Sequence, residues 1–229
     1  MLDITKDWNL KIDKLRKLIR SSKAFVSAIE LALEIHVIPH TSMVSSSVIP
    51  TFCDDLLDGL ANEDYSAMPT EKDETIAWHL WHTTRIEDLT GNILIAEQSQ
   101  IFSDEWMTRL NVTVKDTGNI MTDSQIISFS EQVNKQELIN YRNAVGCQTR
   151  NILKSLTPND LKRKPEAEYL ARLVSEGGLL ESKNSIWLKN LWGRQTVAGL
   201  ILLPLTRHHM MHLPDSIVIK HSVKNIGKN

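Results

Sequence analysis

The chain of 229 residues contains eight histidines, and five of them fall into two short segments. The first segment, AWHLWHTTRIED, carries His79 and His82, and the second, RHHMMH, carries His208, His209 and His212. His208 and His212 are four residues apart, so they share one face of a helix. A buried neutral imidazole needs partners for its ring nitrogens, and a shared metal ion would be one such partner. The spacing therefore suggests a metal site.

The hydrophobic pattern indicates which of these imidazoles face the interior. The pair at 208 and 212 continues the apolar stripe of Val197, Ile201 and Leu205. His209 lies about 100° round the helix and need not join the pair.

In the first segment His82 precedes Ile86 by four residues and Leu89 by seven, so it also lies on an apolar stripe. His79 precedes Ile86 by seven residues, and spacing alone does not exclude it.

Three neutral imidazole nitrogens leave coordination positions open for water or a substrate. This is the pattern of catalytic zinc sites, and nickel and iron(II) also suit imidazole ligands. By itself, H-x-x-x-H is a weak signal, because helical histidine pairs also serve as core or interface residues. The second segment also lacks the glutamate of the H-E-x-x-H metalloprotease motif.

Other polar residues near the two segments have two interpretations each. Glu87 and Asp88 lie one turn beyond His82, where one of them could act as a general base or orient a ligand. The simpler interpretation is an ion pair with Arg85 at the surface. His36 and His40 form another pair four residues apart. Pro39 makes a continuous helix between them doubtful, and His40 is a weak candidate for a pocket residue.

The aromatic and sulfur side chains favour structural roles. Trp78 and Trp81 are expected in the core or at an interface rather than as a platform for substrate. Cys147 is expected to be a small core residue, and the charges of Asp54 and Asp55 should raise the pKa of the Cys53 thiol.

Helical periodicity dominates the chain, and only the segment IVIKHSV is a weak strand candidate. We predict an all-α protein: a four-helix bundle of the up-down kind with long crossovers and short accessory helices. One domain should span 1–229, with its core at about 10–213 and a frayed polar tail at 220–229. The expected long helical segments are 12–33 (one helix or a pair, ending near Pro39), 76–96, 134–156 and 185–212, the last kinked or restarted at Pro204. The expected short helices are 101–112, 122–131 and 166–176.

Composition narrows the class of protein. The net charge of −2 gives no electrostatic footprint for nucleic acid. No apolar stretch reaches the roughly 20 residues that span a bilayer, and the N-terminus does not resemble a secretory signal. The two cysteines form no C-x-x-C pair. We therefore expect a cytoplasmic protein that binds neither nucleic acid nor membranes and acts on a small molecule.

The two histidine segments, together with DEWMTRL, DTGN and YRNAVGCQT, resemble the DinB/YfiT-like superfamily over roughly residues 25–220. The resemblance implies a four-helix protein with a three-histidine metal site. One ligand lies early on the second long helix and an H-x-x-x-H pair on the last. By position these fall on His82, in the context W-x-L-x-H, and on His208 and His212. The resemblance thus favours His82 over His79.

One departure from the family pattern is Pro214-Asp215, which replaces a helical turn containing glutamine. The helix could bend or restart there, and Asp215 could orient a ligand imidazole or approach the metal. The simpler interpretation places Asp215 in the first turn of a new helix. Glu87, His209 and Asp215 remain weak candidates for catalytic residues.

The resemblance also implies chemistry with a low-molecular-weight thiol, either S-transfer or thiol-assisted isomerisation. An open zinc, nickel or iron site would bind such a thiol as the thiolate. A hydrolase could use the same ion to activate water, and a non-catalytic helical protein in stress or interaction would use the fold alone. Members of the family pair through bundle faces, so the segment IWLKNLW could cover a homodimer interface or pack on the core.

Overall fold

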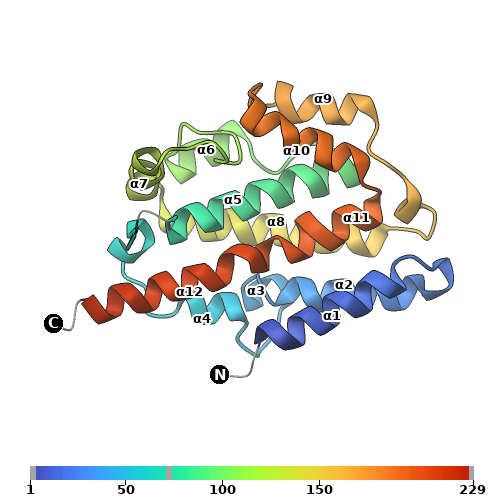
Figure 1. Ribbon diagram of the computed structural model, residues 1–229, viewed down its shortest axis with the longest axis horizontal. Helices are drawn as coiled ribbons and strands as arrows, with labels where there is room; N and C mark the ends of the chain where they lie inside the picture. Colours follow the sequence, from blue (N-terminus) through green and yellow to red (C-terminus); the bar gives the residue numbers. More distant parts are fainter. Residues whose placement is uncertain (1–3, 71–73, 227–229) are drawn as a thin grey trace.

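A computed structural model describes residues 4–70 and 74–226 (Figure 1). Within these ranges the regular structure is helical and contains no strand, which confirms the predicted all-α class. Four helical segments form the bundle: α2 (Phe25–Val37), α5 (Ile76–Asp88) with the π-helical η3 (Leu89–Ile95), α8 (Lys135–Ser155), and α11 (Val197–Leu202) with the π-helical η5 (Leu203–Arg207) and α12 (His209–Ile226).

The directions of the helices follow from their contacts. Arg142 of α8 bonds to Thr83 of α5, and Thr149 lies beside Gly91, so α5 and α8 run parallel. Two parallel neighbours require a long return connection, and residues 96–134 supply the expected crossover. In Figure 1, α12 lies alongside α5, and it runs in the opposite direction.

Shorter helices cover the ends and sides of the bundle. In Figure 1, α9 and α10 lie above α5, and α1 packs beside α2. The other α-helices are α1 (Ile4–Leu18), α3 (Ser42–Ser45), α4 (Phe52–Leu57), α6 (Asp104–Leu110), α7 (Asp123–Gln132), α9 (Ala167–Ser175) and α10 (Lys183–Arg194). The 3₁₀ turns are η1 (Ser22–Ala24), η2 (Glu63–Ser66) and η4 (Asp160–Lys162).

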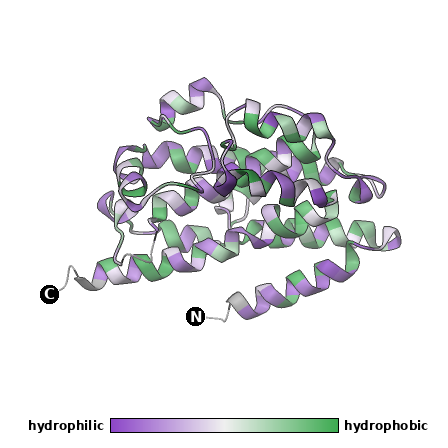
Figure 2. Ribbon diagram, turned by 45° about the horizontal axis from the view of Figure 1, so that its top comes forward, coloured by the Kyte–Doolittle hydropathy of each residue, from purple (hydrophilic) through white to green (hydrophobic). Residues whose placement is uncertain are grey.

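Two apolar clusters fill the interior and meet along α5. One joins α1, α2, η3, α10 and α11, with Trp192 as a large member. The other, around Trp81 and Tyr141, joins the first half of α5 to α8 and the crossover. Figure 2 shows hydrophilic and hydrophobic residues on the same helices, as amphipathic helices require. Burial on this scale, rather than helix propensity, holds the helices in place.

The helix starts follow local capping chemistry. Thr122 forms a capping box with Gln125 at the start of α7, which lies within one residue of the predicted helix 122–131. Thr75 caps α5 by accepting a hydrogen bond from the Trp78 backbone N–H. The predicted segment 12–33 is a pair of helices, α1 and α2, separated by a short turn.

The C-terminal segment differs from the expectation of a frayed tail. Helix α12 continues through Pro214 to Ile226, so the weak strand candidate IVIKHSV is helical. Lys220 explains much of this order, because its Nζ donates to the backbone oxygens of Asp55, Leu56 and Asp58 at the end of α4. Residues 227–229 lie outside the described ranges. None of the helices described is both long and apolar enough to cross a bilayer.

Candidate metal centre

The structure brings the imidazoles of His82, His208 and His212 together from α5 and from the junction of η5 with α12. One ring nitrogen from each lies within 4.8 Å of the others. The ring centroids are 4.8–5.0 Å apart. This arrangement holds three nitrogen donors around one point, as the hypothesis of a shared ion requires.

The orientation of His82 leaves one nitrogen free. Its Nδ1 lies 2.8 Å from the backbone oxygen of Thr117, which can only accept, so Nδ1 carries the proton. Nε2 therefore keeps its lone pair. The ring stacks on Trp78 with centroids 4.4 Å apart, and Trp78 itself donates to the oxygen of Gly118. The crossover thus fixes the orientation of His82, as outer partners do for metal-bound histidines.

The other two imidazoles face each other across one helical turn. Their Nε2 atoms are 3.2 Å apart, and Nδ1 of His208 is buried without a hydrogen-bond partner. Burial lowers the pKa of His82 to about 4 and of His212 to about 3, and holds that of His208 well below the usual value. All three rings are therefore neutral near pH 7, which is the form that binds a metal ion.

A π-helical turn positions this pair. Pro204 cannot donate a backbone hydrogen bond, and the N–H of His208 reaches back five residues to the oxygen of Leu203. The expected break at Pro204 is thus a widened turn, and the helix axis continues into α12. Such π-helical insertions occur often at functional sites.

His79 does not join the cluster, because both of its ring nitrogens are engaged elsewhere. Nδ1 lies 2.8 Å from Oγ of Ser216, and Nε2 lies 3.3 Å from a carboxylate oxygen of Glu74. Asp215 is exposed on α12, so the suggested approach of its carboxylate to the metal site is wrong. The helix is continuous at Pro214 and turns the Asp215 side chain outward.

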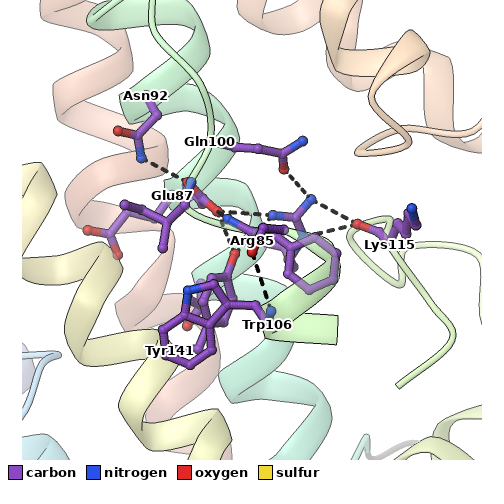
Figure 3. Close-up of polar contacts among 12 residues, drawn as sticks. Arg85, Glu87, Asn92, Gln100, Trp106, Lys115 and Tyr141 are labelled. Atoms are coloured by element: carbon purple, nitrogen blue, oxygen red, sulfur yellow. Dashed lines mark hydrogen bonds and ion pairs between the residues drawn. The ribbon is translucent and has the colours of Figure 1, made fainter. Parts of the chain in front are cut away.

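The two carboxylates after His82 are both fully buried, which overturns the expectation of a surface ion pair. Asp88 forms the ion pair with Arg85, inside the protein. Glu87 instead lies among three other histidines: His36, His40 and His209. In Figure 3 the carboxylate of Glu87 points away from Arg85.

Space beside the metal centre is available for a small molecule. A cavity of about 270 Å³ reaches the rings of His82 and His208. Its other walls come from Ile86, Asn119, Trp187, Leu188, Leu191, Trp192, Leu203, Pro204 and Met211, among which no side chain is charged. Among these residues only Asn119 comes from the crossover, and α10 supplies four: Trp187, Leu188, Leu191 and Trp192.

Apart from the two histidines, Asn119 is the one side chain with an amide or hydroxyl group among the residues that line this cavity. Its Oδ1 is buried without a hydrogen-bond partner. A side-chain amide can present either a donor or an acceptor after rotation, so it suits a polar atom of a bound molecule. The half-exposed Trp187 lies at the same cavity and packs less tightly than Trp192, which belongs to the core.

The two cysteines lie away from the cavity lining. Cys53 is buried, and burial is the main cause that raises its pKa, ahead of the charge of Asp54. Cys147 is exposed on α8, so the expectation of a core position is wrong. Neighbouring Gly146 rather than Cys147 faces His40 and Val44 of α3.

Replacing Gly146 by alanine should disturb His40. A Cβ atom at this position would lie 2.7 Å from Nδ1 of His40 and 3.1 Å from Val44. We expect the Gly146→Ala variant to lose about 1–3 kcal/mol of unfolding free energy, the usual cost of overpacking a core. Urea unfolding would measure it. In the control variant Gly91→Ala the nearest atom is 3.5 Å away, and an equal loss in both would contradict this account.

The donor set fits a divalent metal ion. Nitrogen pairs about 3–3.5 Å apart are the spacing that ligands show around an ion about 2 Å from each. The distance of 3.2 Å between the two facing Nε2 atoms lies in that range, and the lone pair of His82 completes three donors.

The comparisons with known proteins agree with this picture. A family model described as the DinB superfamily matches residues 53–213, more than two thirds of the chain. The match includes all three imidazoles of the cluster. No curated protein sequence matched the chain.

Proposed function

Because the chain belongs to the DinB superfamily, we propose that it is a metal-dependent enzyme in which His82, His208 and His212 bind one divalent ion. The proposed reaction is transfer of a low-molecular-weight thiol to a small electrophile. The observation that carries the proposal is the convergence of three neutral imidazoles at the end of an uncharged cavity. A divalent ion with open positions lowers the pKa of a bound thiol, which favours the nucleophilic thiolate.

The residues around the ion have separate roles in this proposal. Thr117 holds the proton of His82 on Nδ1, which keeps Nε2 available as a ligand. Trp187, Leu191 and Trp192 provide an apolar wall for the electrophile and exclude water. Asn119 offers one hydrogen-bonding group beside this wall, which can orient a polar atom of the substrate.

The cavity also limits the class of electrophile. Its lining lacks a lysine, an arginine or a carboxylate, so it offers no partner for a charged group. Burial of apolar surface therefore supplies most of the binding energy. We propose uncharged, largely apolar or aromatic electrophiles as substrates.

Replacing His212 tests the metal site. We expect the His212→Asn variant, purified without a histidine tag, to bind one ion fewer per chain than the wild type and to lose thiol conjugation to an aromatic model electrophile. The control His221→Asn removes an exposed histidine of the same helix and should leave both unchanged. Elemental analysis measures the ion, and thiol consumption measures the activity. Retention of the ion by His212→Asn at the wild-type level would overturn the site.

The same protein preparations distinguish the proposed transferase from a hydrolase and from a non-catalytic protein. An ion-dependent hydrolysis of activated esters without thiol consumption would favour the hydrolase, since a metal-bound water is also acidic. An ion without either activity would favour a non-catalytic role.

A further inference from the structure

A second group of metal-type ligands lies outside the three-histidine centre. His36, at the end of α2, and His40, in the turn after it, each approach the carboxylate of Glu87 on α5. One donor atom from each residue lies within 4.8 Å of the others, and all three side chains are fully buried. From these residues we propose a second divalent-metal site, formed by His36, His40 and Glu87.

The distances are those of ligands around a common ion. Nε2 of His36 is 2.7 Å from one carboxylate oxygen of Glu87, and Nε2 of His40 is 3.1 Å from the other. Ligand atoms about 2 Å from a shared ion lie about 3 Å apart when they subtend a right angle. Two histidines and one carboxylate on one side of an ion form a known open set for divalent first-row metals.

His40 supplies the independent observation. Neither of its ring nitrogens forms a hydrogen bond, although the ring is completely buried. Oε2 of Glu87 also lacks a well-oriented hydrogen bond, despite its short distance to His40. A buried polar group without a partner is costly, and such exceptions in a native fold need a cause. An ion between Nε2 of His40 and Oε2 of Glu87 would give both atoms a partner.

His209 belongs to this cluster in a different role. Nη2 of Arg142 lies 3.2 Å from Nδ1 of His209, and a guanidinium can only donate. The proton of a neutral His209 therefore sits on Nε2, which faces Oε2 of Glu87 at 3.1 Å. Nε2 of His209 forms no well-oriented hydrogen bond in this arrangement, and because it carries the proton it does not offer a lone pair to the ion.

Arg142 also sets the expected strength of the site. Its buried side chain is anchored by Thr83, Thr84 and the oxygen of Pro39, on the far side of the His209 ring from Glu87. A positive charge this close opposes a divalent cation. We therefore expect the second site to release its ion to a chelator before the three-histidine site does.

The number of zinc ions bound by the folded protein tests the proposal. The full chain is dialysed against excess zinc, freed of loosely bound ions and analysed for metal and protein. We expect two equivalents for the wild type, one for His36→Gln and one for Glu87→Gln. His212→Asn should also bind one equivalent, and the double variant His36→Gln/His212→Asn should bind none.

The numbers of ions bound by these variants distinguish the two sites. One equivalent in the wild type that His212→Asn removes and His36→Gln retains would overturn the second site. One equivalent that only His36→Gln and Glu87→Gln remove would support the second site and overturn the first. Should a second-site variant fail to fold, the counts of the wild type and of folded His212→Asn still decide. One equivalent in the wild type and none in His212→Asn would leave no ion for the second site.

Discussion

The Asp88→Ala variant should lose about 3–5 kcal/mol of unfolding free energy, the cost of leaving a buried charge without its partner. Asp88 accepts hydrogen bonds from Arg85, from the hydroxyl of Tyr141 and from the backbone N–H groups of Ile101 and Phe102. A further bond comes from Asn92. Alanine removes all of these acceptors and leaves the guanidinium buried. Urea unfolding followed by circular dichroism measures the loss.

An exposed ion pair provides the control. Lys115 and Asp104 form a salt bridge whose acidic side chain is 88% exposed, so Asp104→Ala should cost at most about 1 kcal/mol. Equal losses for the two variants would show that the buried network contributes no more than a surface pair.

This network also matters for the metal centre. Figure 3 shows Arg85 between Gln100 and the backbone of Lys115, both of which belong to the crossover. The crossover carries Thr117, which holds the proton on His82. We therefore expect any Asp88→Ala protein that folds to bind the ion more weakly, because His82 loses its support.

Acidification should destabilise the metal-free protein below about pH 6.5. Histidine in an unfolded chain has a pKa of about 6.5. Burial lowers that of folded His82 to about 4 and that of folded His212 to about 3. Between these values the unfolded chain binds more protons, so stability falls as the pH falls. His82 alone accounts for a loss of about 3 kcal/mol between pH 6.5 and 4.

Urea unfolding of metal-free protein at a series of pH values between 7.5 and 4 measures this effect. The His82→Asn variant lacks one of the titrating groups, so its stability should depend less steeply on pH. A flat wild-type profile over this range, or an identical slope in the variant, would contradict the assignment of buried neutral imidazoles.

Sequence reasoning worked best where a pattern extended over many residues. The periodicities of 76–96 and 134–156 predicted α5 with η3, and α8, almost to the residue. The start of the helix at 122–131 was predictable because capping depends on a few neighbouring residues, here Thr122 and Gln125. The persistence of α12 to Ile226 was not predictable, because it depends on contacts between Lys220 and the distant α4.

For the metal centre, the sequence identified the three imidazoles that the structure brings together, since each lies on an apolar stripe and the family resemblance favoured His82 over His79. It did not predict the environment of Glu87. The surface ion pair was expected because carboxylates are usually exposed. Only the packing of α2 on α8, the neighbour of α5, brings His36 and His40 to this carboxylate, from about fifty residues away. The signal in the sequence was the spacing of that histidine pair.

The π-helical turn at η5 has a consequence for how this protein could change. Each residue of an α-helix turns the chain by about 100° around the helix axis. A π-helical turn contains one extra residue, so removing one residue within 203–207 and restoring α-helical geometry would leave the directions of all later side chains unchanged. Removing one residue just after it would rotate every later side chain by that angle. The neighbours His208 and His209 point to different clusters, so such a shift would misdirect both at once. The residues just after η5 should therefore tolerate substitutions more readily than changes in length.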